Sequence, residues 1–221
     1  CVNLLKSPIR GGNIALKLDV RKAFDTLDWS FICKIFTMYG FDEVFINWVK
    51  YILSSAHISI LINGSLDGYF DCLRGVRKGD PLSAVIFSIS KDYLIRFLSI
   101  MAGNGKLNTI LARRGIASPS HLSYAADIIL FTQGEKGNIK NIKRALFHYE
   151  KVTGQEISCN KSFLYFVINF SSSRKNDILR EMGIQEGALP FTYLGVPMFW
   201  GRSKACYFSG IVGMIIRQLS S

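Results

Sequence analysis

The sequence predicts an α+β fold in which helices cover one face of a mainly antiparallel sheet. Two observations lead to this class. Short apolar stretches with strand periodicity alternate with amphipathic helical stretches, and two pairs of strands are close enough in the chain to form hairpins. The order is strand, two helices, hairpin, helix, hairpin, helix, strand. Hairpins favour this class over a doubly wound parallel sheet.

The chain is long enough for a sizeable core and is strongly basic. It has 221 residues, of which 49% are hydrophobic, so we expect one or two compact domains. Its net charge of +11 favours a polyanionic partner, either nucleic acid or an anionic membrane. The best apolar stretch, residues 82–101, is interrupted by Lys91, Asp92 and Arg96, so we expect no membrane span.

Cysteine usage and the first residues point to an intracellular protein of the nucleus or cytoplasm. The five cysteines are scattered without a C-x-x-C pair, which indicates neither a zinc site nor a disulfide-linked partner. Lys6 and Arg10 interrupt the apolar residues at the start, so no secretory signal is visible. His57, His121 and His148 have no metal-ligand spacing, and we interpret them as structural or surface residues.

The first half of the chain contains one strand, two helices and one hairpin. Residues 1–13 carry little signal, and residues 14–20 form a short apolar strand. Asp28 and Asp42 are good N-caps for two successive helices. Alternating isoleucines then lead into Asn63-Gly64, which is a strong hairpin signal.

The second half begins with a basic loop and a long helix. Asp80 and Pro81 form an N-cap and a first-turn proline, so the loop before them leads into a helix N-terminus, which attracts phosphate. An ordinary loop with solvated basic residues explains this stretch equally well. A connector of residues 103–120 leads into a hairpin of residues 123–131 with Asp127 at its tip. A helix (139–153) and a strand (163–168) follow. The chain continues with a short helix (174–183) and a last strand or turn (193–198).

Two acids end apolar strands in distant parts of the chain. Asp19 closes the strand of residues 14–20, and Asp127 stands at the tip of the later hairpin. A solvated turn acid is the ordinary explanation of Asp127 alone. Two strand-end carboxylates can instead meet and hold divalent metal ions, and oxygen ligands with open positions suit Mg²⁺.

Five stretches, in family order, resemble the reverse transcriptase of non-LTR (LINE-type) retrotransposons, most closely the plant kind. They are residues 16–25 (LKLDVRKAFD), 74–83 (RGVRKGDPLS), 121–131 (HLSYAADIILF), 154–157 (GQEI) with 161–162 (KS), and 193–197 (YLGVP). The resemblance implies a right-hand polymerase palm. Residues 1–170 would form the palm with partial fingers, and residues 171–221 the palm-to-thumb connection with an incomplete thumb.

The resemblance also implies a reaction and its partners. The 3′-hydroxyl of a primer paired to an RNA or DNA template would attack a deoxynucleoside triphosphate. Two Mg²⁺ (or Mn²⁺) ions about 3.5–4 Å apart would activate the hydroxyl and neutralise the leaving phosphates.

Roles for individual residues follow from the same resemblance. The metal positions would be Asp19, Val20 and Asp127, and Lys161 would approach the leaving pyrophosphate. Phe24 would be the steric gate under the incoming sugar, although a core aromatic residue is the alternative for it. The substrate-binding residues would be Phe24, Arg74, Gly75, Lys78 and Gly79, and the primer-binding residues would be Tyr193, Leu194 and Gly195.

The chain departs from the family pattern at the metal site. The family hairpin carries two adjacent acids, whereas here Ala126 precedes Asp127. The missing acid is, by resemblance, the one that ligates the metals most directly with Asp19. Metal binding is therefore expected to be weak or absent. Other departures are Lys78 where the family has Gln and Ala84 where it has Pro.

Three interpretations remain open. The chain is a reverse transcriptase with a damaged site, a non-catalytic palm that binds nucleic acid, or an incomplete product with exposed apolar surface. Few residues precede Asp19 or follow Pro197, so we expect most of the fingers and thumb to be absent, as in an excised palm from a decayed element.

Overall fold

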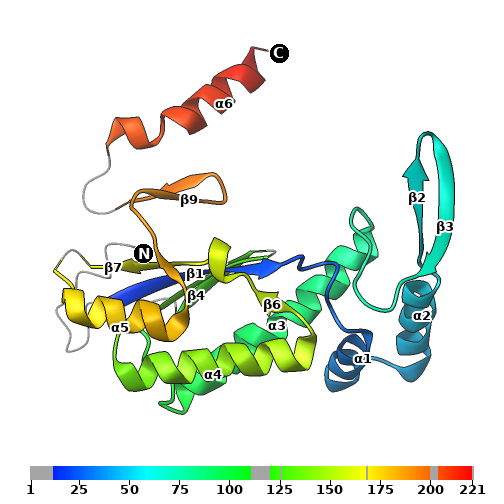
Figure 1. Ribbon diagram of the computed structural model, residues 1–221, viewed down its shortest axis with the longest axis horizontal. Helices are drawn as coiled ribbons and strands as arrows, with labels where there is room; N and C mark the ends of the chain where they lie inside the picture. Colours follow the sequence, from blue (N-terminus) through cyan, green and yellow to red (C-terminus); the bar gives the residue numbers. More distant parts are fainter. Residues whose placement is uncertain (1–11, 111–119, 125, 168, 200–203, 221) are drawn as a thin grey trace.

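The computed structural model describes residues 12–110, 120–124, 126–167, 169–199 and 204–220. A mixed sheet lies at its centre, with helices beneath and a small hairpin above (Figure 1). The strand order is β4-β5-β1-β7-β8, with β6 paired to the far end of β1. All pairs are antiparallel except β7 with β8, so the expected class is confirmed. The strands are β1 (Asn13–Arg21), β4 (His121–Tyr124), β5 (Asp127–Gln133), β6 (Glu156–Ile157), β7 (Phe163–Phe166) and β8 (Gln185–Glu186).

Three helices cover one face of this sheet: α3 (Pro81–Gly103), α4 (Lys136–Thr153) and α5 (Ser172–Met182). The alternation of side chains along β1 explains which residues meet them. Leu16 and Leu18 point toward the helices and are almost fully buried. They form the main core with apolar residues of the helices, including Leu94, Leu98, Ile142, Tyr149, Ile178 and Met182.

The other face of the sheet carries a short hairpin, β9 (Phe191–Tyr193) and β10 (Val196–Met198), which lies above the strands in Figure 1. Tyr193 packs there against Ala15, Ile129, Phe131 and Tyr165. These residues alternate in their strands with those of the main core, so the sheet has an apolar face on each side.

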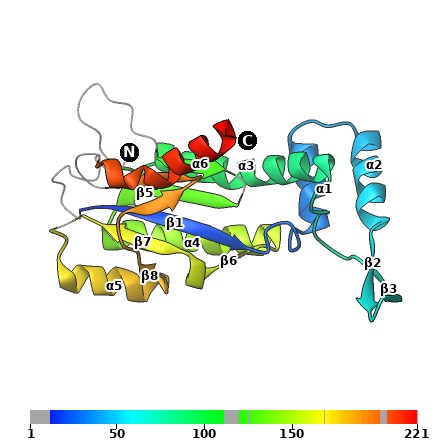
Figure 2. The ribbon, with the colours of Figure 1, turned by 90° about the horizontal axis from the view of Figure 1, so that it is seen from above.

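A second helical unit lies beside the sheet. It contains α1 (Trp29–Met38), capped by Asp28, and α2 (Glu43–Ser54), capped by Asp42, as expected. Most apolar side chains of α2 are exposed or only partly buried: Trp48 is 62% exposed, and only Val49 and Leu53 are buried. The hairpin of β2 (His57–Ile62) and β3 (Ser65–Asp71) projects away from the sheet in both ribbon views (Figures 1 and 2).

Several elements were not predicted. The two-residue strands β6 and β8 exist only through pairing with β1 and β7, so no local pattern marks them. Helix α6 (Ser209–Leu219) was also not predicted, and it has no buried residue. Residues 1–11 of the expected leading segment and 111–119 of the expected connector lie outside the described residues. So do residue 125 of the expected hairpin and residue 168 of the expected strand of residues 163–168.

No helix within the described residues combines the length and the apolar character that spanning a membrane requires.

Candidate active site

Asp19 and Asp127 face each other across the β1–β5 ladder. They are direct antiparallel partners, so their side chains leave the same face of the sheet. Each lies on the same side of its strand as residues of the hairpin-covered face, Ala15 in β1 and Ile129 and Phe131 in β5. Both carboxylates therefore stand on the face opposite the helices, where the sheet ends.

Residues that follow α4 hold the main chain of Asp19. Its N–H donates to the buried Ser162 Oγ at 3.1 Å, and its carbonyl accepts from the Ser158 N–H at 2.8 Å. The next residue, Val20, pairs with Ile157 in β6. One later segment therefore holds the main chain at this end of the strand.

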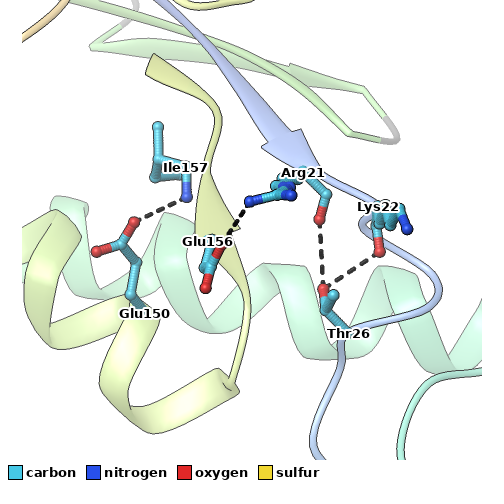
Figure 3. A network of polar contacts seen from close by, with 6 residues as sticks. All are labelled: Arg21, Lys22, Thr26, Glu150, Glu156 and Ile157. Carbon is cyan, nitrogen blue, oxygen red and sulfur yellow. Dashed lines mark hydrogen bonds and ion pairs between the residues drawn. The ribbon is translucent and has the colours of Figure 1, made fainter. Parts of the chain in front are cut away.

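A surrounding polar network extends this anchoring (Figure 3). Glu150 accepts a hydrogen bond from the Ile157 N–H at 2.8 Å and so connects α4 to β6. Arg21 and Glu156 form an exposed ion pair at 3.4 Å between β1 and β6. The Thr26 hydroxyl donates to the carbonyls of Arg21 and Lys22, which steadies the turn after β1.

Burial and three charged groups shift the pKa of the Asp19 carboxyl group. Burial raises the pKa of its carboxyl group, Lys161 lowers it, Asp127 raises it, and Lys17 lowers it. Lys161 lies in a 3-10 turn, Cys159–Lys161, and lines with Asp19 and Val20 a groove of about 660 Å³. The structure thus places Lys161 near Asp19. The structure also shows that the charge of Lys17 acts on Asp19. The sequence signal for this residue was its position two residues before Asp19 in the strand.

A buried lysine lies behind the hairpin tip. Lys91 of α3 is 6% exposed, and its Nζ donates to the Asp127 carbonyl at 3.2 Å. Burial lowers the pKa of this ammonium group to about 8, and the charge of Asp127 opposes that shift. A charged residue inside an apolar helical stretch was the sequence signal for Lys91, but its partner could only come from the fold.

Ala126 is part of an apolar cluster and not of the charged site. It packs with Phe24 and Ile157 against the buried Val20 and Phe87. Among the described residues, no three His, Cys, Asp or Glu side chains are grouped to hold a metal ion. Asp28 and Asp80 are used as helix N-caps. The two carboxylates fit a single Mg²⁺ that is also held by substrate phosphates, whereas a pair of ions lacks anionic ligands.

Phe24 stands at the edge of this cluster. Its ring stacks on Phe87 with centroids 4.5 Å apart, and its carbonyl accepts from the Val76 N–H at 2.7 Å. The side chain is half-buried, so a packing role and a partly open face coexist.

The basic loop before α3 lines a different cavity. Arg74, Gly75 and Lys78 border a space of about 360 Å³ between α2, the β2–β3 hairpin and the start of α3. Lys78 forms an ion pair with Asp25 at 3.0 Å, so its charge is already partnered. The φ angle of Gly79 is +89°, and a Cβ there would meet open space. These residues share a loop but do not line the Asp19 groove.

The β9–β10 turn approaches the carboxylates from above the sheet. Tyr193 is 8% exposed, and burial followed by the charge of Asp127 raises its pKa. Its hydroxyl has no hydrogen-bond partner among the described residues. Leu194 and Gly195 follow at the tip with positive φ angles. Tyr193 is therefore near Asp127.

Comparison with known proteins identifies the class. A profile of the family described as "Reverse transcriptase (RNA-dependent DNA polymerase)" matches residues 4–198. The chain therefore belongs to the reverse transcriptase family.

Its relatives narrow the family further. The chain is 29% identical over 146 residues to the retrovirus-related Pol polyprotein from the type-2 retrotransposable element R2DM of Drosophila melanogaster, covering 66% of this chain and 13% of that protein. It is 34% identical over 121 residues to that of the type-1 element R2 of Popillia japonica, covering 54% and 16% respectively. The chain is thus related to polyproteins of R2 non-LTR retrotransposons, and it spans about a sixth of their length or less.

Solved structures support the fold alone. A telomerase from Candida tropicalis, in complex with a fragment of telomeric RNA, matches with a TM-score of 0.57 at 14% identity. The match covers 98% of this chain and 35% of the telomerase. A Candida albicans telomerase matches with a TM-score of 0.54 at 13% identity, over 72% of this chain and 28% of that one.

Proposed function

We propose that this chain is the palm of an RNA-directed DNA polymerase from a plant-type LINE element, and that it has lost nucleotidyl transfer. The observation that carries the proposal is the cross-strand pair of Asp19 and Asp127 on one face of the sheet, in a chain of the reverse transcriptase family. The loss follows from Ala126, whose methyl group lies in an apolar cluster where the reaction needs another anionic ligand.

In this proposal Asp19, Val20 and Asp127 hold Mg²⁺ (or Mn²⁺). The ion, when bound, supplies Lewis-acid activation of a primer hydroxyl and neutralises phosphate charge. Lys161 shares a groove with Asp19, so its ammonium group neutralises charge on the leaving phosphates. Ser162 and Ser158 keep the Asp19 main chain at the strand end, so the carboxylate position does not depend on the ion.

The remaining residues bind substrate and primer in the proposal. Phe24 presents its half-exposed ring to the incoming sugar, while Phe87 supports it from behind. The basic loop, with Arg74, Gly75, Lys78 and Gly79, borders the triphosphate and template. The β9–β10 turn, with Tyr193, Leu194 and Gly195, borders the primer end near Asp127.

The proposed division of the chain follows these roles. Residues 1–170 form the palm with part of the fingers, and residues 171–221 lead into the thumb. The sheet strands other than β8, together with α3 and α4, fall within the first part. Strand β8, α5, the β9–β10 hairpin and α6 fall within the second.

A second candidate function is nucleic-acid binding without catalysis. The groove around Asp19 is also lined by Arg21, Lys22 and Lys161, and the whole chain has a net charge of +11. Such a surface binds a phosphate backbone with little sequence preference and with strong salt dependence.

Two chimeric polymerases test the proposal. Residues 14–198 are placed between the fingers and thumb of an active relative, once with Ala126 and once with Ala126→Asp. We expect primer extension with Mg²⁺ only from the repaired chimera, at least about a thousandfold faster, which corresponds to roughly 4 kcal/mol of transition-state stabilisation. Asp19→Ala in the repaired chimera should abolish extension again.

The two candidates separate in the same proteins. Efficient extension by the chimera that keeps Ala126 would overturn the proposed loss of activity. Salt-dependent binding of primer–template by that chimera, without extension, is the result expected of a non-catalytic palm. No extension from the repaired chimera, despite normal folding and binding, would show that Ala126 is not the decisive change.

A further inference from the structure

The solvent-facing side of α4 carries a row of basic residues. Its exposed charged side chains are Lys136, Lys140, Lys143, Arg144 and Lys151, and the acid of the helix, Glu150, is only partly exposed. Residues spaced by four lie one above another on a helix, so these cations form a single stripe. With a rise of 1.5 Å per residue, the stripe is about 22 Å long.

Most of this charge is not neutralised within the described chain. Lys143 is paired with Glu181 of α5 at 3.6 Å, but Lys136, Lys140, Arg144 and Lys151 form no ion pair among the described residues. The acids of the helix and its cap have other partners. Glu150 accepts from the Ile157 N–H, and Glu135 accepts from the Asn108 side chain.

One end of the stripe works against the stability of its own helix. Lys136 stands at the N-terminus, where the macrodipole is already positive, and the first turn has no acid. Phe147 lies within the stripe and is 59% exposed, with the Lys151 Nζ 5.4 Å from its ring centroid. Lys151 stands in the last turn, where the macrodipole favours a cation, so local helix energetics account for Lys151 but not for Lys136.

We propose that the basic stripe, defined as Lys136, Lys140, Arg144 and Lys151, binds the phosphodiester backbone of duplex nucleic acid. Its length of about 22 Å corresponds to roughly six base-pair steps of 3.4 Å. Helix α4 lies beneath the sheet in Figure 1, and Asp19 and Asp127 project from the other face of the sheet. The stripe is thus a second surface for nucleic acid, separate from the candidate active site and beyond the proposed polymerase function.

The packing of α4 favours nucleic acid over a lipid surface. An interfacial helix inserts a wide apolar face into the bilayer. Here that face, including Ile139, Ile142 and Tyr149, is buried against the sheet and α3. Phe147 and Val152 are the large apolar side chains that α4 exposes. The cations remain accessible, as a phosphate ligand requires.

A pair of matched double variants of the full chain tests the stripe. Lys140→Gln with Arg144→Gln removes two charges from it. Lys34→Gln with Lys50→Gln removes two charges from exposed positions of α1 and α2. The probes are blunt DNA and RNA duplexes, with anionic phospholipid vesicles as a third arm, and binding is titrated from about 50 to 200 mM salt.

We expect the stripe variant to bind duplex at least about tenfold more weakly at 100 mM salt. Two lost phosphate contacts should reduce the slope of log K against log salt by about 1.8 for DNA. The control variant should change binding by less than about twofold. Equal weakening in both variants, no weakening in the stripe variant, or binding to vesicles but not duplex would overturn the proposal.

Chemical protection of the unmodified protein provides an independent readout. Bound duplex should shield the amines of Lys136, Lys140 and Lys151 from acetylation, while Lys34 and Lys50 remain reactive. Absence of protection at the stripe when duplex is bound would contradict the proposal even if the variants misfold. Since these measurements involve no primer extension, they are independent of the chimeras that test polymerase activity.

Discussion

Asp19 and Asp127 are opposite residues of adjacent antiparallel strands, and both project from the face of the sheet that the helices leave uncovered. The pairing places two acids from distant parts of the chain at one strand end. Their mutual repulsion contributes to the raised pKa of Asp19, while Lys161 and Lys17 oppose it. The site is therefore balanced by two lysines that belong to the protein itself.

Restoring the missing acid should strengthen metal binding in the isolated chain. Ala126→Asp adds a carboxylate beside Asp127, and we expect Mn²⁺ affinity, measured by electron paramagnetic resonance, to rise about tenfold or more, which is about 1.4 kcal/mol or more. Ser172→Asp, at an exposed position of α5, adds the same charge elsewhere and should leave affinity unchanged. Equal gains in both variants would mean that the effect is only long-range charge.

Removing the side chain that holds Asp19 should destabilise the protein. Ser162→Ala leaves the Asp19 N–H without its 3.1 Å acceptor, and Ser162 is fully buried. We expect a loss of about 1–3 kcal/mol in the free energy of unfolding, measured by urea denaturation. Ser172→Ala on exposed α5 should stay within about 0.5 kcal/mol. A Ser162 variant as stable as this control would show that the hydrogen bond is replaced by water.

Two glycines of the basic loop should respond differently to alanine. Gly75 and Gly79 have φ angles of +85° and +89°, so alanine is strained at both. At Gly75 the added Cβ would lie 2.7 Å from the Asp25 carbonyl oxygen, whereas at Gly79 it meets nothing within 4 Å. Thermal or urea unfolding should therefore show Gly75→Ala to be less stable by a further 1–3 kcal/mol or so. Equal losses would refute the close approach of Gly75 to Asp25.

The buried Lys91 should make stability depend on pH. Its pKa is about 8 in the folded protein and near the usual 10.5 when unfolded, so the unfolded state holds more protons between these values. The contribution of Lys91 to stability therefore rises with pH across this window, and below pH 8 its burial cost is fully present. The advantage of Lys91→Met over the unmodified protein should be greatest near pH 7 and shrink toward pH 10.

The control for this prediction is Lys140→Met at an exposed position. Its difference from the unmodified protein, followed by urea unfolding between pH 7 and 10, should be nearly constant. A constant difference for Lys91→Met as well would mean that Lys91 titrates like a surface lysine in the folded protein.

Local patterns determined most of the secondary structure. Asp28, Asp42 and Asp80 are the N-caps of three helices, as their sequence positions predicted, because a capping side chain acts on the backbone two or three residues away. Asn63-Gly64 connects a hairpin for the same local reason. The five family stretches identified the reverse transcriptase family from their order in the chain.

Only the tertiary structure decided which charges meet. The sequence placed Asp19 and Asp127 at strand ends, but their register depends on how β1 and β5 pair, and a slip of one residue would send them to opposite faces. Lys91 behind the hairpin and Ser162 beneath Asp19 come from α3 and from the segment after α4, and no local rule joins them to the site. Burial and cross-strand partners are set by non-local packing, which is why the pKa of Lys91 and the two separate basic surfaces could be assigned only after the chain was folded.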